Sequence, residues 1–312
     1  MVNKPKILVI GSINMDLTLM TDTLPRSGEA IFGSAYQYNP GGKGANQATA
    51  AALLGADVWF AGKIGQDDNG FRLRQSLEGF GVYTQGLLDD MEASTGLAAI
   101  IVEKTGRNRI LVFPGANMRL ASEDVIPLME KIHPDAIILQ FEIPDETVLA
   151  CSIAAQSMGI PVVVDAGPAK PFPIEKLGRL LFFSPNETET QIFCGILPDT
   201  EENAQRAAQV MWEQTGAVYV VIKRGDNGAY LYDGKDFSRN YPAIPVHAID
   251  TTAAGDAFTA ALTLHYLHTQ NIEASIRYAN AVGALCVTRS GAQSSMPTAV
   301  EVELFLSKQN YH

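Results

Sequence analysis

Short apolar runs rich in Val and Ile recur along this chain, and longer segments of helical pattern separate them. The runs are KILVIG at 6–11, DVWFAG at 57–62, AIILQ at 136–140, IPVVVDA at 160–166, LLFFSP at 180–185, VYVVIKRG at 218–225 and AYLYD at 229–233. Strands that are apolar on both faces and alternate with helices are typical of a parallel sheet covered on both sides. The pattern therefore predicts an α/β fold, a three-layer sandwich with a mostly parallel central sheet. Such sheets bind ligands at the carboxyl ends of their strands.

Two stretches interrupt this alternation. Residues 15–38 and 95–113 are typical of hairpins, and the second is expected to turn at 104–107. We expect their strands to form a small separate sheet, which would act as a lid that excludes water from a sugar or nucleotide site. The alternative is an antiparallel edge of the main sheet. No repeat or linker interrupts the chain, so residues 1–312 are expected to form one domain.

The stretch DTTAAGDAF at 250–258 places a carboxylate, Asp256, directly after three residues with very small side chains. It could be an ordinary helix start, capped by one of residues 250–252, with the acid offsetting the helix dipole. Alternatively, the small side chains of residues 253–255 leave free backbone N–H groups open to phosphate. An acid beside an anion site is unfavourable unless it takes a proton from an attacking hydroxyl. The stretch therefore favours phosphoryl transfer.

Several polar residues follow the predicted strands. Asn14 and Asp16 come after the first, and a carboxylate next to an amide suits the adjacent hydroxyls of a polyol, although this pattern alone is also common in turns. Glu142 follows AIILQ, where a solvated loop acid is the alternative. Lys43 and Asn46 follow a Gly41–Gly42 pair that either admits a ligand or only makes a turn before a tightly packed helix. The glycines fit neither G-x-x-x-x-G-K-[ST] nor G-x-G-x-x-G.

Two further strand ends carry candidate residues. Asn186 and Glu189 in SPNETE lie three apart, so they share a helical face and could hold Mg²⁺ through water, or they could simply cap the helix. Gly225 and Gly228 in KRGDNGAYLYD bound a turn between two strands.

Charge limits the class of partner. The chain has 34 Asp and Glu against 23 Lys and Arg, a formal net charge of −11, which argues against nucleic acid and against an anionic membrane surface. The N-terminal apolar run is too short for a signal peptide, and no later stretch is long enough to span a membrane. We therefore expect a cytoplasmic protein with small-molecule partners.

Taken together, the motifs resemble the ribokinase family of sugar kinases, the phosphofructokinase-B type, along nearly the whole chain. They are GSINMD at 11–16, GGKGANQA at 41–48, PGAN at 114–117, SPNETE at 184–189, DTTAAGDAF at 250–258 and VTRSGAQSSMP at 287–297, in the family's order and spacing. Within the family, GGKGANQA and SGAQ look most like the ribokinases proper. This similarity implies an ATP-dependent carbohydrate kinase that converts D-ribose to D-ribose 5-phosphate.

The resemblance also implies roles for individual residues. It makes Asp256 the general base, beside an anion hole of backbone N–H groups from Ala253, Ala254 and Gly255. It assigns the sugar to Asn14, Asp16, Gly42, Lys43, Asn46, Glu142 and Asp256. It assigns the nucleotide to Asn186, Lys223, Gly225, Gly228, Gly255 and Asn280, with Asn186 and Glu189 in the region that organises Mg²⁺. A monovalent cation, usually K⁺, would be held by Asp250, Thr252, Cys286, Arg289, Gly291 and Ser295, mostly through backbone oxygens. A homodimer through the lid is implied as well.

The chain departs from the family motifs at two places. Many ribokinases read N-x-A-P-A where this chain has DAGPA at 165–169, a change near the active site that weakens the assignment of the sugar. Many also read F-N-G-A-L where this chain has FTAAL at 258–262, which we expect to change helix packing only. A kinase of fructose, 2-keto-3-deoxygluconate, adenosine or pseudouridine is therefore the alternative, and a sugar sensor without turnover is a more distant one.

Overall fold

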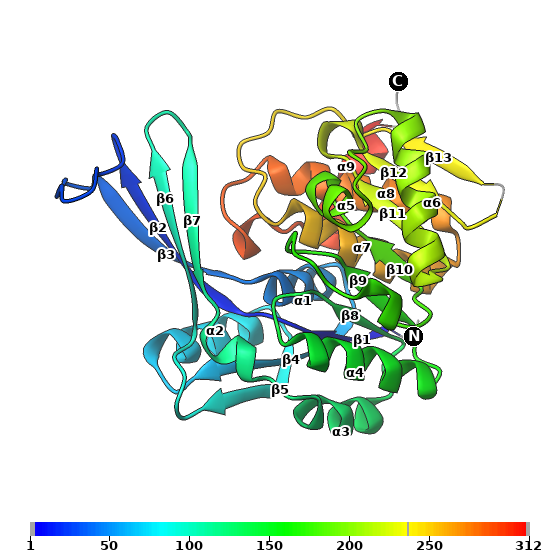
Figure 1. Cartoon of the computed structure of the whole chain (residues 1–312), viewed down its shortest axis with the longest axis horizontal. Coiled ribbons are helices and arrows are strands. Elements are labelled where there is room, and N and C mark those ends of the chain that lie inside the picture. The colour runs from blue at the N-terminus through cyan, green and yellow to red at the C-terminus, as the bar shows by residue number, and fades with distance from the viewer. Residues whose placement is uncertain (1–3, 236, 310–312) are drawn as a thin grey trace.

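A nine-stranded sheet forms the centre of the computed structural model within the described residues, 4–235 and 237–309 (Figure 1). Its strands lie in the order β13-β12-β11-β10-β9-β8-β1-β4-β5, and all neighbours pair in parallel except at β12 and β13, which are antiparallel. The bounds are β1 Lys6–Ile10, β4 Asp57–Gly65, β5 Tyr83–Asp90, β8 Ala136–Leu139, β9 Val162–Asp165, β10 Phe182–Ser184, β11 Tyr219–Lys223, β12 Ala229–Tyr232 and β13 Ser238–Tyr241. The predicted mostly parallel sheet is confirmed.

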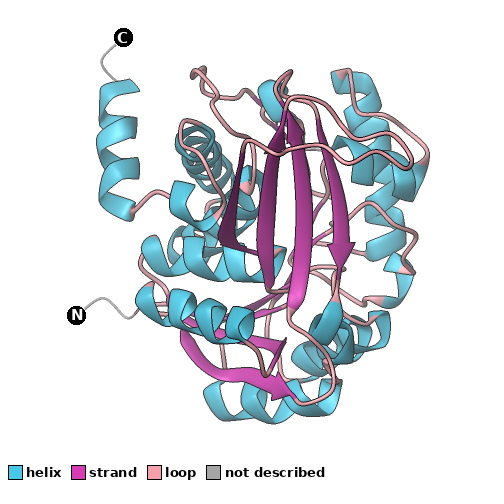
Figure 2. Cartoon of the chain, turned by 90° about the vertical axis from the view of Figure 1, so that its left-hand side faces the viewer, coloured by secondary structure: helices cyan, strands magenta, loops and turns pink. Residues whose placement is uncertain are grey.

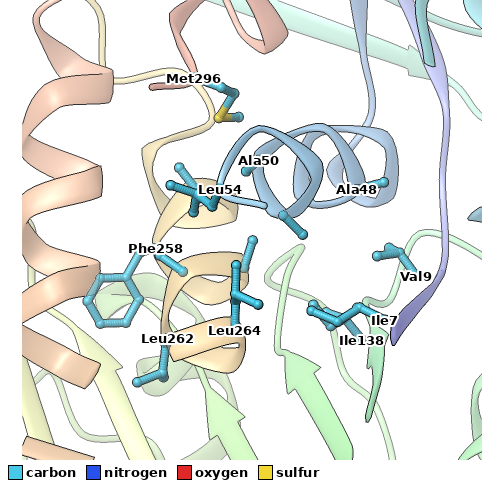
Figure 3. Close-up of a cluster of buried hydrophobic side chains, with 14 of the residues drawn as sticks. Ile7, Val9, Ala48, Ala50, Leu54, Ile138, Phe258, Leu262, Leu264 and Met296 are labelled. Atoms are coloured by element: carbon cyan, nitrogen blue, oxygen red, sulfur yellow. The ribbon is translucent and has the colours of Figure 1, made fainter. Parts of the chain in front are cut away.

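Helices cover both faces of this sheet, as the apolar runs predict. Their bounds are α1 Lys43–Leu53, α2 Asp68–Gly79, α3 Ser122–Ile132, α4 Asp145–Ser157, α5 Glu187–Cys194, α6 Glu201–Thr215, α7 Ala254–Thr269, α8 Ile272–Val287 and α9 Ala299–Gln309. Alternate residues of β1 serve opposite sides: Ile7 and Val9 pack with α1, α2, α7 and α8, whereas Leu8 and Ile10 pack with α3, α4 and α6. Figure 3 shows the first of these cores, where Ile138 of β8 lies beside Ile7 of β1.

A second, four-stranded sheet projects from this body (Figure 1). It consists of β2 Asn14–Thr21, β3 Ala35–Gly41, β6 Gly96–Glu103 and β7 Asn108–Phe113, in the order β3-β2-β6-β7. Figure 2 shows these strands toward the viewer, with helices beside and behind them. We call this the small sheet. The predicted separate sheet is thus confirmed, including the turn at 104–107, and the alternative of an edge of the main sheet is wrong.

The topology fixes where ligands can bind. β1 lies between β4 and β8. Later strands are added first on the β4 side and then on the β8 side, so the strand order reverses at β1 and a crevice can form at the carboxyl ends of β1 and β8. Open α/β sheets form their ligand crevice at such a point. None of the helices in the described part of the chain is both long enough and apolar enough to cross a membrane.

Candidate active site

A side-chain hydrogen bond joins the loop after β1 to the loop after β8. The Ser12 hydroxyl donates to the Glu142 carboxylate, although the two residues are 130 positions apart. Asn117, from the PGAN motif, also acts at this place: its Oδ1 accepts from the Ile13 N–H at 2.9 Å, and its Nδ2 donates to Asn14 Oδ1 at 2.8 Å. Ser12 and Asn117 therefore hold the predicted sugar residues in place, and the quoted motifs, not the spacing of single residues, are the signal that could have identified them.

Asp16 lies in β2 without an internal partner. Among the described residues, none donates a hydrogen bond to its carboxylate, and burial, followed by the charges of Glu142 and Asp256, raises its pKa to about 7. A half-buried carboxylate of this kind needs hydrogen-bond donors to remain charged. Two sugar hydroxyls are donors of the right type.

The glycine pair before α1 allows this close arrangement. A Cβ on Gly41 would overlap the Asp16 carboxylate, and one on Gly42, whose φ is 91°, would lie 2.7 Å from Asn14 N. The pair therefore brings the chain against β2 and starts a helix whose residues 44–51 are buried. The interpretation as a turn before a tightly packed helix is confirmed, and it places Lys43 and Asn46 beside the site.

Asp256 is buried in the first turn of α7, where three side chains of α1 surround it. Asn46 Nδ2 donates to its Oδ2 at 2.9 Å, Gln47 Nε2 lies 3.4 Å from its Oδ1, and Lys43 Nζ lies 3.8 Å away. Burial raises the pKa of Asp256 to about 6, although the Lys43 ammonium opposes this shift. Asp256 is therefore ionised at neutral pH and yet basic enough to accept a proton.

The N-terminus of α7 has no side-chain cap. Ala253 occupies the capping position in the left-handed region, with a φ of 62°, so the predicted ordinary cap by residues 250–252 is wrong. The Ala254 N–H makes only a 3.4 Å contact with the Thr251 carbonyl, and residues 253–255 line a cavity. Helix N-termini with open amides bind anions.

This cavity has a volume of about 800 Å³, within the range of small-molecule sites. It collects every residue that the resemblance assigns to the nucleotide, together with two of the sugar group: Asn186, Lys223, Gly225, Gly228, Gly255, Asn280, Lys43 and Asp256. Its walls include Ile244, Pro245, Val246, Ala284 and Val287, which are apolar. Asp256 thus stands between the sugar residues and an apolar-walled cavity.

Asn186 and Glu189 form a reciprocal cap on α5. Asn186 Oδ1 accepts from the Glu189 N–H at 2.9 Å, and Glu189 Oε2 accepts from the Asn186 N–H at 2.7 Å, so the capping interpretation is confirmed. The other oxygen, Glu189 Oε1, receives no hydrogen bond from the described residues. Within the described ranges, no group of three or more His, Cys, Asp or Glu side chains could hold a metal.

The residues predicted for a monovalent cation come together from two segments. Asp250 joins these segments, because its Oδ1 accepts from the Thr252 N–H and its Oδ2 from the Gly291 N–H, both at 2.9 Å. Cys286 Sγ lies 3.0 Å from Ser295 Oγ. Arg289, between Cys286 and Gly291 in the sequence, forms an ion pair with Glu301, with Nη2 2.6 Å from Oε1. The loop that leads into α7 is thereby tied to the end of α8.

Asp165 of DAGPA and Thr259 of FTAAL, which belong to the two motifs that depart from the family, contact each other. The Thr259 hydroxyl of α7 donates to Asp165 Oδ2 at 2.7 Å, and Lys223 Nζ lies 2.7 Å from the same oxygen. The expectation that FTAAL changes only helix packing is therefore wrong. Sequence reasoning missed this cluster because the three residues belong to distant segments, and each alone fits an ordinary strand or helix.

Known proteins are similar to this chain over nearly its whole length. Residues 4–299 match the family described as pfkB family carbohydrate kinase. A ribokinase of Bacillus subtilis is 36% identical over 302 residues, which cover 96% of this chain and 99% of that protein. A deoxyribokinase of Salmonella typhimurium is 34% identical over 303 residues, 96% of this chain and 98% of that protein. The structure of Arabidopsis thaliana ribokinase complexed with ribose and ATP superposes with a TM-score of 0.91 at 32% identity, covering 97% of this chain and 99% of that one.

Proposed function

Because the chain belongs to the pfkB family of carbohydrate kinases and is an ATP-dependent sugar kinase, we propose that its acceptor is D-ribose, phosphorylated at O5. One observation carries the proposal: Asp256 stands between Asn14 and Asp16 of β2 and the open amides of α7 that line the cavity. A base, an acceptor site and an anion site must meet in this way for a hydroxyl to attack a phosphoryl group.

In the proposed mechanism the oxygen of the sugar hydroxyl attacks the γ-phosphorus of ATP, and Asp256 accepts the proton of that hydroxyl. The bond from that phosphorus to the β,γ-bridging oxygen breaks, and ADP leaves with the electron pair. The N–H groups of residues 253–255 donate to the transferring oxygens as they gain charge. Mg²⁺ bound to the triphosphate would neutralise its charge, and Asn186 and the free Oε1 of Glu189 fit a contact to it through water.

Recognition of ribose is assigned to Asp16, Asn14, Gly42, Lys43, Asn46 and Glu142. Asp16 supports ribose over 2-deoxyribose, because the 2-deoxy sugar would leave the half-buried carboxylate with one fewer hydroxyl donor. The relatives of this chain include both ribokinases and deoxyribokinases, so the preference for ribose needs a test. Initial rates with ribose, 2-deoxyribose, fructose, 2-keto-3-deoxygluconate, adenosine and pseudouridine test the proposal. A kcat/KM for ribose below that of any other sugar would contradict it.

A monovalent cation would bind where the segments around Asp250 and Gly291 meet. The support is their mutual hydrogen bonding next to the loop that leads into Ala253, because a carbonyl-bound K⁺ there would steady the open amides. Rates in potassium chloride above those in tetramethylammonium chloride are expected. Equal rates would contradict the proposal.

The small sheet would serve as the lid over the sugar, and two copies of the chain would pair through it. Side chains of paired residues lie on the same face of a sheet, so Ala98 and Val112 share the face of Asp16. The opposite face carries Leu17, Tyr38 and Leu111. An exposed apolar face of this kind is typical of a protein–protein interface.

A further inference from the structure

Asp165 is a buried carboxylate that the mechanism above does not use. It ends β9 and is buried, and its Oδ2 accepts from both Lys223 Nζ and the Thr259 hydroxyl at 2.7 Å. Its Oδ1 has no hydrogen-bond partner among the described residues. Burial would raise the pKa of Asp165, but the Lys223 and Lys43 ammonium groups outweigh this and hold its pKa below the usual value. The group therefore stays charged.

Stability alone does not account for this ion pair. A buried pair generally adds no stability over apolar side chains of the same size, because both charges lose their hydration. Here one carboxylate oxygen also lacks a partner, which adds to the unfavourable desolvation. Such a pair is easier to explain if one of its charges acts on a ligand.

Lys223 is the member of the pair that reaches the cavity. Its side chain is 11% exposed and lines the cavity, whereas that of Asp165 is 1% exposed and lies behind it. A Cβ built on Gly255 would lie 3.7 Å from Lys223 Nζ, so the ammonium lies beside the open end of α7. An ammonium has three N–H donors, and among the described residues only Asp165 accepts one.

We propose that Lys223 is a catalytic residue whose ammonium, positioned by Asp165 and Thr259, donates to the oxygens of the transferring phosphoryl group beside the amides of residues 253–255. Asp165 is the positioning residue. The inference rests on the proposed phosphoryl transfer but not on the identity of the sugar. It makes the anion site a combination of neutral amides and one fixed cation, which is the arrangement that favours the charge developing in the transition state.

A variant in which both charges are replaced by neutral side chains distinguishes a catalytic role of Lys223 from a structural one. Lys223→Gln alone removes the ammonium that is hydrogen-bonded to the buried Asp165 carboxylate and leaves only the Lys43 charge nearby, so both Tm and kcat should fall. The double variant Asp165→Asn/Lys223→Gln replaces the ion pair with two amides of similar size. Its Tm should recover to near the wild-type value, whereas its kcat should stay about 10²-fold lower, the usual effect of removing one charge-stabilising donor. Recovery of kcat together with Tm would overturn the proposal.

Nucleotide binding supplies a readout that needs no sugar. The double variant should bind β,γ-imido-ATP about tenfold or more weakly than wild type in calorimetry, while its affinity for ADP changes little, because only the triphosphate presents the γ-group. Equal losses for both nucleotides would overturn the assignment. Asp165 raises the pKa of Asp256 and Lys223 lowers it, so the pH optimum of the double variant should also stay close to that of wild type.

Two further comparisons keep the test decisive. If the double variant does not fold, Lys223→Arg is compared with Lys223→Gln: about tenfold higher kcat for the arginine variant supports the charge, and equal values reject it. Arg74→Gln, which removes a surface ion pair with Asp89, is the control and should leave kcat unchanged. The acceptor is whichever sugar the wild type phosphorylates, so failure of ribose in the panel leaves this test intact.

Discussion

The Asp256 carboxylate would have to be charged to act as the proposed base, and yet it is buried. Three neighbours resolve this conflict, because Asn46, Gln47 and Lys43 supply donors and positive charge at 2.9, 3.4 and 3.8 Å. Burial alone would raise the pKa further, so without these α1 side chains the group would be protonated more of the time. At the scale of single residues, the charge of the proposed base therefore depends on the contact between α1 and α7.

Removing the charge of Asp256 should abolish most of the turnover while sugar binding is kept. We expect Asp256→Asn to lower kcat by about 10²-fold or more, because the amide cannot accept the hydroxyl proton. Ribose binding in calorimetry should change only slightly, since the shape is kept. Asp68→Asn, an exposed acid in the first turn of α2, is the matched control and should behave as wild type. A fully active Asp256→Asn enzyme would rule out the assigned base.

The raised pKa values of Asp16, about 7, and Asp256, about 6, predict a link between pH and sugar binding. Each unfolded pKa is near 3.8, so between pH 4 and 7 the folded chain holds more protons than the unfolded one. These groups therefore lower the free energy of unfolding as pH rises across that interval. Ribose hydroxyls that donate to Asp16 would offset this loss.

Thermal scans with and without saturating ribose measure the effect. The increase in Tm caused by ribose should be larger at pH 8 than at pH 5, and kcat/KM should rise as pH increases through about 6 to 7. In Asp16→Asn the difference between the two Tm shifts should disappear. A shift that is the same at both pH values in wild type would show that Asp16 does not bind the sugar as an anion.

At the scale of elements, the start of α7 depends on one unusual backbone position. Ala253 has a φ of 62°, a conformation that costs a non-glycine residue about 1 kcal/mol or more. We expect Ala253→Gly to leave the free energy of unfolding unchanged or to raise it by up to about 1 kcal/mol, with kcat kept. Ala254→Gly, at the first residue of the helix, should lower it by up to about 1 kcal/mol. Urea unfolding distinguishes the two, and equal losses would contradict the strain at Ala253.

The elements that the sequence predicts best are those with the strongest pattern. The apolar runs of β1, β8, β9, β10 and β11 identify the buried strands, because these are covered on both faces. The edge strands β5 and β13 are missed, since YTQGLLDD and SRNY mix polar and apolar residues as half-exposed strands do.

The candidate site follows the same rule, because predictability depends on whether its parts lie in one motif. The α7 start could be predicted since acid and amides lie within four residues of sequence. The contacts of Asp165 with Lys223 and Thr259 could not, because they join β9, β11 and α7 across 58 and 94 positions. Asn117, whose partner Asn14 is 103 positions away, is a second example.

At the scale of the whole molecule, the small sheet is the part whose surface does not suit an isolated chain. Its face opposite Asp16 exposes Tyr36, Leu111 and Phe113 by 69, 58 and 54%. Apolar residues on a four-stranded sheet normally pack against a second layer, and Figure 2 shows the helices beside and behind these strands. A second copy of the chain offers an identical face, which a two-fold axis can pair with the first.

We therefore expect wild-type protein to have twice the 33.6 kDa mass of one chain in light scattering, and Leu111→Arg to have the mass of one chain. The arginine would bury a charge without a partner at the interface. Because β7 pairs with β6, which borders the strand of Asp16, loss of the partner should also loosen the lid and raise the KM for sugar more than it lowers kcat. Val300→Arg places the same charge on α9, at a side chain 64% exposed, and should change neither mass nor KM. A wild-type mass of 33.6 kDa would show that the exposed face has another purpose.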